Sequence, residues 1–361
     1  MRNEGMTYRT QQGMKKTTLR RSPISHFSFL ILNFSLLITH LLLLTACSND
    51  SDEIKEPENA LGMVSFTRGD NPFTATDDYS PVGVFLVDGD GTTPTQSGRF
   101  VYKSNEMPAI WRSSIEVTSN HNYAIYGYAP ADAVTATISN ESLTGATLTF
   151  NNLPAVSGQD VCFVVGVQQL ESATTAKNIP MGSFSFTGQN GNNLANLLMD
   201  HLYAAICLQM SIGEEYSNLR SIKIRKLELQ ATKATATATV VLAPNTTLTS
   251  PVQSATYSNL TGTQSSAIFF DSTEGVELSA DDLKEATCCF VPSLSGSLTL
   301  VTTYDVYDKK GNKISERTAT NKLPGFYPNR GQRIKLQLTI EPTYLYQLSD
   351  PDLDDPTVMV N

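Results

Sequence analysis

The chain has 361 residues, of which 17% are charged and 40% hydrophobic, and its formal net charge is −9. Residues 1–46 carry six Lys or Arg and one acid, so the rest of the chain has a net charge of −14. Binding to nucleic acid needs a cationic footprint that displaces counterions, so we expect no nucleic-acid partner. The length suffices for one large core or two ordinary ones, and we expect two domains.

A Leu- and Ile-rich run occupies residues 27–44, after four basic residues and before a group of small ones. This order of basic, apolar and small segments is typical of a secretory signal peptide, which we assign to residues 1–46. A transmembrane anchor is the alternative, because eighteen residues fall at the short edge of a spanning length. Asn33 and His40 disfavour the anchor, since a lipid-exposed helix would have to bury both side chains.

The run ends in Leu44-Thr45-Ala46-Cys47, which resembles the lipobox of bacterial lipoproteins. In that motif the signal peptidase cuts before a Cys whose thiol carries diacylglycerol, and here that residue is Cys47. Residues 47–60 continue as an acidic tether that is too poor in apolar residues to fold. Such a tether resembles the surface-export signal of Bacteroidetes lipoproteins. We therefore expect a surface-exposed lipoprotein of the outer membrane, held to its lipid through Cys47.

From residue 61 onward the pattern is one of short runs in which apolar and polar residues alternate, separated by Gly, Pro, Asn and Asp. Between Arg225 and Lys226 the alternation slips, as a β-bulge would make it slip. Helical periodicity is confined to residues 192–201 and 279–286. The predicted strands cover residues 82–87, 100–102, 110–117, 123–128, 146–150, 161–167, 184–186, 202–210, 222–229, 298–306, 313–320 and 334–340, the run 313–320 being polar enough for a sheet edge.

Regular strand and turn spacing with little helix predicts an all-β chain made of two β-sandwich domains. Residues 188–193 form the best interior break, since all six favour turns. We place the N-terminal domain at residues 61–190, the C-terminal domain at residues 191–342 and a tail at residues 343–361.

Four cysteines follow Cys47, and their spacing matches no zinc pattern. Cys288 and Cys289 are adjacent, so on a strand they would point to opposite faces. Burial of all four as small hydrophobic residues is favoured, and a Cys162–Cys207 disulfide stays open.

Residues with the spacing of a catalytic or cofactor site are missing from the sequence. It contains no Gly-x-Ser-x-Gly elbow, no His-Glu-x-x-His and no phosphate-binding Gly loop. His121 and His201 are the only histidines after the signal, and His201 opens an apolar strand, where a core or capping role is favoured. We predict a protein that is not an enzyme and has no cofactor. A hydrolase with paired carboxylates stays open, because only the fold brings such a pair together.

The sequence Asp88-Gly89-Asp90-Gly91 looks like half of a calcium loop. An EF-hand needs Gly at the sixth position and Glu at the twelfth, where this chain has Thr93 and Arg99. A surface turn is the better interpretation, and we predict no metal site.

Several short motifs, in the order in which they occur, resemble the fimbrillin-like pilus subunits of Bacteroidales over nearly all of the chain after Cys47. The motifs are Val64-Ser65-Phe66-Thr67-Arg68, Val82-Gly83-Val84-Phe85, Tyr126-Gly127-Tyr128-Ala129-Pro130, Leu198-Met199-Asp200-His201-Leu202-Tyr203-Ala204, Phe290-Val291-Pro292, and Leu323-Pro324-Gly325 before Ile334-Lys335-Leu336-Gln337-Leu338. This resemblance implies an adhesive pilus subunit, exported as a lipoprotein and built from two transthyretin-like sandwiches. Its implied partners are other pilus subunits, outer-membrane lipid, and a ligand on a host or bacterial surface.

In such pilins an Arg-specific surface protease removes the first strand, and the open groove accepts a strand from the next subunit by β-augmentation. Mapped onto this chain, the removable strand is residues 61–67 and Arg68 is the candidate cleavage point. A surface-loop role for Arg68 is the alternative, because Arg99 and Arg112 also lie in the first domain. Anchor subunits keep their lipid and skip this cut.

The tail holds the candidate donor segment that the resemblance implies, with Tyr344, Tyr346 and Leu348 in alternation and Val358 and Val360 near its end. A tail that packs on its own domain is the alternative. A second function class, a glycan-binding lipoprotein of a polysaccharide-uptake system, would share the signal, tether and β-domains. Sugars stack on flat aromatic platforms, and the only Trp is Trp111 in a predicted strand, which favours the pilin.

Overall fold

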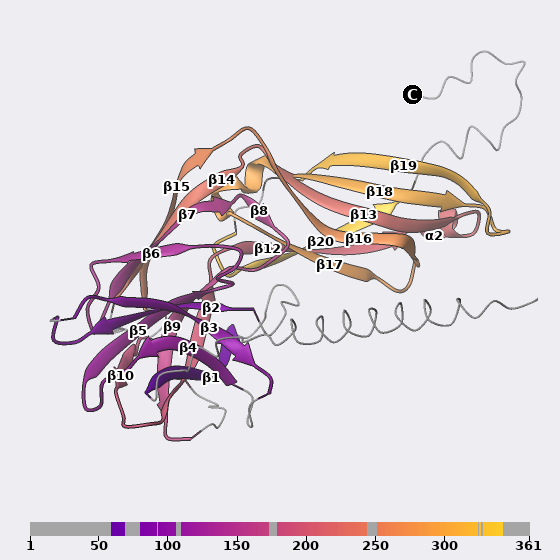
Figure 1. Cartoon of the computed structure of the whole chain (residues 1–361). Coiled ribbons are helices and arrows are strands. Elements are labelled where there is room, and N and C mark those ends of the chain that lie inside the picture. Colours follow the sequence, from indigo (N-terminus) through magenta and orange to yellow (C-terminus); the bar gives the residue numbers. More distant parts are fainter. Residues whose placement is uncertain are drawn as a thin grey trace, which may run out of the picture. The chain divides into compact units, whose positions relative to one another are not determined.

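The computed structural model describes residues 59–68, 80–91, 93–105, 110–172, 179–243, 251–323, 325 and 328–341. Within these ranges the chain is built almost entirely of strands (Figure 1). Helical segments there are limited to α2 (Glu214–Ser217) and a 3₁₀ turn at Pro292–Ser297. No helix in the described ranges has the length and apolarity to cross a membrane. The chain is therefore all-β, as its alternation predicts.

The first sheet has eight strands and closes on itself. Its order is β10 (Ser185–Thr187), β5 (Asn122–Ala129), β2 (Val82–Asp88), β3 (Gln96–Lys103), β4 (Ile110–Glu116), β1 (Ala60–Arg68), β11 (Asn193–His201) and β9 (Cys162–Leu170). Strand β9 also pairs with β5, through Tyr128 opposite Phe163 and Ala129 opposite Cys162. The ring from β5 round to β9 encloses a core that includes Phe100, Ile125 and Leu197.

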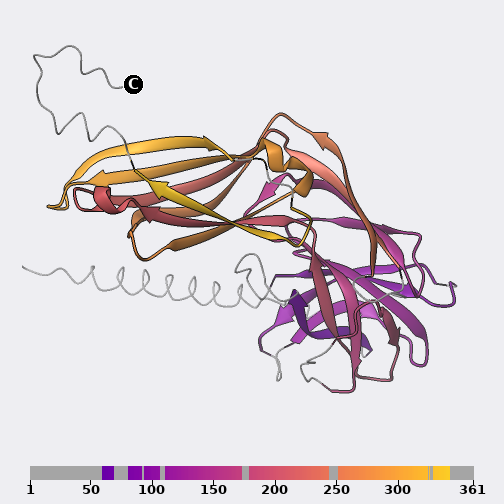
Figure 2. The same ribbon diagram turned by 180° about the vertical axis from the view of Figure 1, so that it is seen from behind.

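The other strands form three sheets of four strands each. The first of these has the order β20 (Arg333–Ile340), β12 (Ala204–Ile212), β17 (Lys284–Phe290) and β8 (Val156–Ser157). The second has the order β16 (Ser265–Glu277), β13 (Ser221–Ala231), β18 (Thr299–Tyr307) and β19 (Lys313–Lys322). The third has the order β15 (Val252–Thr261), β14 (Thr235–Leu242), β7 (Ala146–Pro154) and β6 (Ala136–Ser139). The orange and yellow C-terminal strands run alongside one another in both ribbon views (Figure 1, Figure 2).

The sheet of β12 and the sheet of β13 pack face to face as a sandwich. Leu208 and Met210 of β12 share one core with Ile222 of β13 and Leu300 of β18. A larger core joins the sheet of β7 to the outer side of the first sheet, where Phe150 lies with Tyr126 and Phe163. Strand β14 alternates buried and partly buried residues and β12 is buried on both faces, so burial of the apolar positions holds the sheets together.

Several details expected from the alternation are confirmed. The slip at Arg225 is a register shift between Ile224 and Lys226 in both pairings of β13. Strand β19 is the polar edge of its sheet. The four cysteines after Cys47 are buried and none forms a disulfide, so the Cys162–Cys207 bridge that the sequence left open is not formed.

Two details differ from the sequence analysis. The helical periodicity of residues 192–201 is misleading, because these residues form β11, an inner strand whose residues are buried on both faces. A strand buried on both faces reads as a continuous apolar run, which periodicity cannot separate from a helix. Residues 279–286 likewise hold no helix and lead into β17.

The sheets also bear on the predicted domain boundary at residue 190. Strand β11 follows the turn at 188–193 yet belongs to the first sheet, and β7 pairs with β14 across that point of the sequence. A division into two domains stays a prediction. Any division that respects the first sheet falls after His201, where β11 ends.

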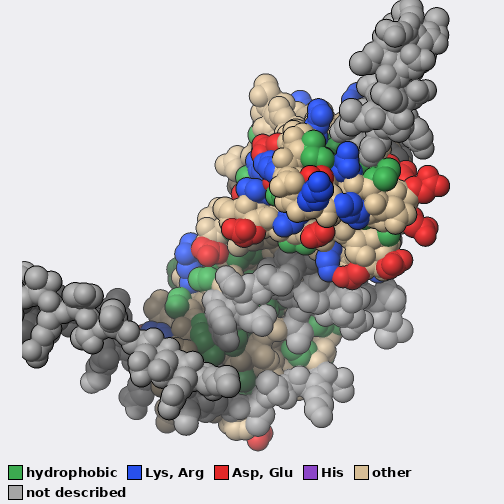
Figure 3. Space-filling view, turned by 90° about the vertical axis from the view of Figure 1, so that its right-hand side faces the viewer, with side chains coloured by type: hydrophobic (Ala, Val, Ile, Leu, Met, Phe, Trp, Pro, Cys, Tyr) green, Lys and Arg blue, Asp and Glu red, His purple; other side chains and the backbone are tan. Residues whose placement is uncertain are grey.

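The charged surface is of mixed sign. In Figure 3 the Lys and Arg side chains are interspersed with Asp and Glu over the part of the face that is coloured. On this face the basic residues do not gather into a stripe that could follow a phosphate backbone.

Candidate functional site

Strand β1 includes residues 61–67, whose removal the fimbrillin-like resemblance implies, and it is an inner strand of the first sheet (Figure 1). On one side it runs parallel to β11, from Leu61 opposite Asn193 to Arg68 opposite Met199. On the other side it runs antiparallel to β4, with Met63 opposite Trp111. In the described sheet, β4 and β11 do not pair with each other. Within the described sheet, β1 is therefore the one strand that joins these two.

The apolar side chains of β1 fill the enclosed core. Leu61 and Met63 are 0% exposed and belong to the core cluster inside the closed sheet. Val64 packs on the other side of the strand with Ile110 and Leu194. Full burial of a Leu or Met side chain is worth about 1.5–3 kcal/mol relative to exposure, so the two core residues contribute several kcal/mol to the closed form.

Polar contacts fix the register of β1 against both neighbours. The Ser113 hydroxyl on β4 donates to the Leu61 carbonyl at 2.8 Å, and the Ser65 hydroxyl donates to Oδ1 of Asn196 on β11 at 2.8 Å. Both Ser113 and Asn196 are buried. The space between β4 and β11 that β1 fills is the β1 slot. A buried polar group without a partner costs free energy, so a strand in the β1 slot must satisfy these side chains as well as the backbone groups.

Gly62 of β1 lies where its neighbours leave little room for a side chain. A Cβ atom at this position would lie 2.7 Å from Leu194 Cδ2 and 3.3 Å from the Arg112 guanidinium. These distances are shorter than ordinary van der Waals contact, so a side chain here forces Leu194 to move within a packed region. No local pattern in the sequence indicates this role of Gly62, because only the packing of β4 and β11 around it creates the restriction.

We expect Gly62→Val to lower the free energy of unfolding by about 1–3 kcal/mol through overpacking of the slot. Urea denaturation of the purified chain measures the loss. Gly296→Val is the matched control, because a Cβ at Gly296 meets no atom within 4 Å, and we expect a change within about 0.5 kcal/mol. Equal losses in the two variants would contradict a tight slot at Gly62.

Arg68 is the last residue of β1. The residues that follow it, 69–79, lie outside the described residues, as do Cys47, the tether up to residue 58 and the tail residues Tyr344, Tyr346, Leu348, Val358 and Val360. Arg68 therefore lies at the end of a strand, and its role as a cleavage point stays a prediction.

Trp111 is buried at 8% exposure. Its ring packs edge-on against Phe66 of β1 at 5.8 Å between centroids, and against Tyr102 of β3 at 4.7 Å. Trp111 is thus part of the packing around β1 and offers no flat open face to a sugar.

The motif that looks like half of a calcium loop is pinned by a histidine. His121 Nε2 lies 2.6 Å from Asp88 Oδ1, and its Nδ1 lies 3.6 Å from Asp90 Oδ2. Hydrogen bonds from the Thr93 side chain, from His121 and from the Asp90 backbone lower the pKa of Asp88 to about 2. The hydrogen bond to Asp88 in turn raises the pKa of His121 above 6.5. The cluster closes the turn after β2 through the hydrogen bonds that Asp88 Oδ1 makes with His121 and with the Asp90 backbone.

The Asp88–His121 pair is expected to stabilise the turn most between about pH 4 and pH 6.5. The contribution of Asp88, whose pKa is lowered, is present above 3.8 and lost as the pH falls toward 2; that of His121, whose pKa is raised, is present below 6.5 and lost at higher pH. Asp88→Asn should return the pKa of His121 toward 6.5 in an NMR titration. Asp308→Asn, in a turn far along the sequence, should leave it unchanged. An unchanged His121 pKa in Asp88→Asn would contradict the pairing.

Comparisons with known proteins give matches at the level of structure alone. Neither a family profile nor a curated protein sequence matches this chain. A candidate cell adhesion protein from Bacteroides uniformis is similar at a TM-score of 0.40 and 12% identity, over 78% of this chain and 91% of the other. A fimbrial protein from Bacteroides vulgatus gives 0.35 and 13%, over 78% and 95%. The fimbrial anchor protein Mfa2 from Porphyromonas gingivalis gives 0.26 and 12%, over 72% and 82%.

These three structures are of fimbrial or adhesion proteins, and their sequences are 12–13% identical to this chain.

Proposed function

We propose that this chain is a structural subunit of a cell-surface fimbria that assembles by strand exchange and serves adhesion. The observation that carries the proposal is the position of β1, an inner strand that joins β4 to β11 and ends at Arg68. No catalytic role is needed for this function. The partners are further copies of the chain or related subunits, and an Arg-specific protease that cuts at Arg68.

The physical step is the opening of a closed sheet. Removal of β1 leaves the edges of β4 and β11 with unpaired backbone groups, and it exposes the core positions that Leu61 and Met63 fill. Unpaired backbone and open apolar surface both cost free energy, and an extended segment laid between β4 and β11 satisfies both along its length. Assembly then completes a fold that proteolysis has opened.

The donor in this proposal is the tail at residues 343–361. The last described strand, β20, pairs with β12 from Arg333 to Ile340. The tail follows it and carries the alternating Tyr344, Tyr346 and Leu348 and the apolar Val358 and Val360. Export as a lipoprotein through Cys47 would bring the subunit to the outer membrane before the cut.

A synthetic peptide of residues 343–361 tests whether the opened sheet accepts the tail. A chain that lacks residues 343–361, and so has no donor of its own, is cut after Arg68 by an Arg-specific protease and separated from the released segment. We expect the peptide to raise the melting temperature of the cut chain by several degrees, because a ligand that binds only the folded state stabilises it. A scrambled peptide of the same composition is the control. Equal effects of the two peptides would contradict a specific donor tail.

A further inference from the structure

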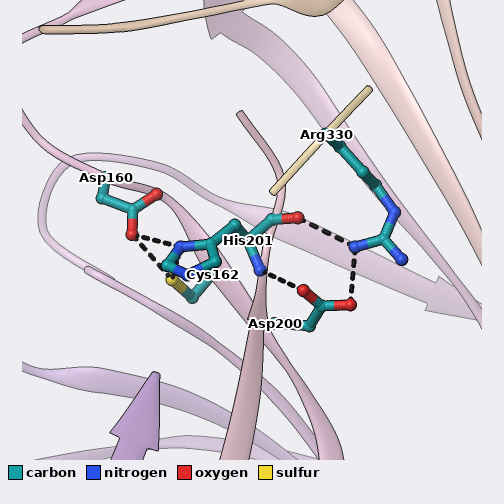
Figure 4. A network of polar contacts seen from close by, with 5 residues as sticks. All are labelled: Asp160, Cys162, Asp200, His201 and Arg330. Carbon is teal, nitrogen blue, oxygen red and sulfur yellow. Dashed lines mark hydrogen bonds and ion pairs between the residues drawn. The ribbon is translucent and has the colours of Figure 1, made fainter. Parts of the chain in front are cut away.

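A second cluster of polar side chains lies where β9 begins and β11 ends (Figure 4). Strands β9 and β11 run antiparallel, and their pairing sets His201, the last residue of β11, opposite Cys162, the first residue of β9. Asp160 lies two residues before Cys162. The topology thereby brings an imidazole, a thiol and a carboxylate together from positions about forty residues apart.

The three groups converge on one point. Asp160 Oδ2 lies 2.6 Å from His201 Nδ1 and accepts a hydrogen bond from Cys162 Sγ at 3.2 Å. Cys162 Sγ lies 3.6 Å from His201 Nδ1. Asp160 and Cys162 are 0% exposed and His201 is 6% exposed, so the cluster is almost closed to bulk water.

One atom of the cluster lacks a partner. Asp160 Oδ1 is buried and accepts no hydrogen bond from any residue that the structure describes. A buried carboxylate oxygen without a donor costs free energy, and each such atom in a native fold calls for an explanation such as a bound ion. The free oxygen belongs to the same carboxylate that already faces the thiol and the imidazole.

We propose that Asp160, Cys162 and His201 form a binding site for a divalent transition metal of the zinc class. Thiolate, imidazole and carboxylate are the side chains that bind Zn²⁺ in proteins, and three protein ligands leave a fourth position for water or for a second oxygen of the carboxylate. Asp160 Oδ1 is available for that role. None of these residues belongs to β1, although His201 ends β11, which pairs with β1 as far as Met199.

The distances suit such a metal after a small adjustment. Bonds of 2.0–2.3 Å in a tetrahedron place ligand atoms roughly 3.3–3.6 Å apart. The sulfur already lies 3.2 Å from the oxygen and 3.6 Å from the nitrogen. Only the separation of 2.6 Å between Nδ1 and Oδ2 is a hydrogen-bond distance, and it must grow by roughly 0.7 Å once the metal replaces the shared proton. Metal binding also displaces the thiol proton.

Neighbouring residues hold the end of β11, which carries His201, in place. The His201 backbone N–H donates to Asp200 Oδ1 at 2.8 Å. The Arg330 guanidinium donates to Asp200 Oδ2 at 2.7 Å and to the His201 carbonyl at 3.0 Å (Figure 4). Contacts of this kind fix ligand orientation around metal sites, so His201 needs little reorganisation to bind.

Cobalt titration of the full chain tests the proposal, with Cys47→Ser introduced to remove the lipid-site thiol. We expect one equivalent of Co²⁺ to produce both a thiolate-to-cobalt charge-transfer band and the visible bands of tetrahedral cobalt. Zn²⁺ should displace the cobalt and abolish both. Cys162→Ser should lose the charge-transfer band, and Cys207→Ser, at another buried cysteine, should keep it.

The readout separates this cluster from the one around Asp88, Asp90 and His121, which has no thiol. Cobalt bands without a thiolate component, or no bands with excess Co²⁺, would overturn the proposal. A charge-transfer band that persists in Cys162→Ser would overturn it too. Asp160→Asn is the second variant: with folding checked by circular dichroism, we expect at least a tenfold weaker affinity for Co²⁺, and unchanged affinity would exclude Asp160 as a ligand.

Discussion

Cutting after Arg68 is expected to convert the purified chain from a monomer into SDS-resistant ladders of multimers. The cut frees β1, which fills the enclosed core through Leu61 and Met63 and pairs with both β4 and β11. Loss of the burial of these two side chains costs roughly 3–6 kcal/mol, and the newly unpaired backbone of β4 and β11 adds to this. In the proposed assembly a segment from a second chain recovers this free energy, so we expect multimers to be the stable state of the cut chain.

Digestion with an Arg-specific protease, followed by electrophoresis with and without boiling, measures this conversion. Arg68→Lys is the matched variant, because it keeps the charge and removes the cleavage site. We expect it to stay intact at this position and monomeric, whereas Arg99→Lys should be cut and should assemble like the parent chain. Mass spectrometry identifies the new N-terminus. Ladders from uncut Arg68→Lys, or a cut chain that stays monomeric, would contradict assembly through the β1 slot.

Deletion of residues 344–361 is expected to abolish the ladders without unfolding the subunit. The final described strand is complete before this segment begins, since β20 pairs with β12 as far as Ile340 opposite Ile212. Ile340 is buried in the core between the sheets of β12 and β13. Because β20 completes this core without the tail, we expect the deletion to change the melting temperature of the uncut chain by less than about 2 °C.

A mixing experiment shows which end of the subunit has been lost. After cleavage at Arg68, a tail-deleted chain still has an open slot but has no donor, so it should accept the tail of an intact cut chain and stop growth there. Increasing its share in a mixture should shorten the ladders progressively. If the deletion unfolds the monomer, or if deleted chains assemble normally, the tail is not the donor.

The sequence predicts most of the strands, because alternation with period two is a local property. Strand β20 alternates Leu336 with Lys335, and β13 keeps its alternation on both sides of the bulge at Arg225. Such patterns need no knowledge of partners. Strand β11 is the counterexample: it is inner and buried on both faces, so its run from Leu194 to Met199 carries no alternation and looks partly helical.

The sequence indicated only part of the candidate site. The fimbrillin-like resemblance implied a removable strand at residues 61–67, yet its neighbours could not be named, since β4 follows it by about fifty residues and β11 by more than a hundred. Gly62, Ser113 and Asn196 gain their roles from strands packed beside β1. Nor did the spacing of Cys162 indicate a metal site, because its companions Asp160 and His201 meet only through the pairing of β9 with β11.

The sequence by itself determined that this chain is acidic and all-β, and it predicts a lipoprotein signal. Charge, alternation and the apolar run before Cys47 can all be read from neighbouring residues. The tertiary structure decided that β1 is an inner strand that closes a sheet, and that a thiol, an imidazole and a carboxylate share one buried point. The physical reason is that strand order and the meeting of distant side chains depend on which strands pair. Pairing is settled by burial across the whole sheet, and no local pattern specifies it.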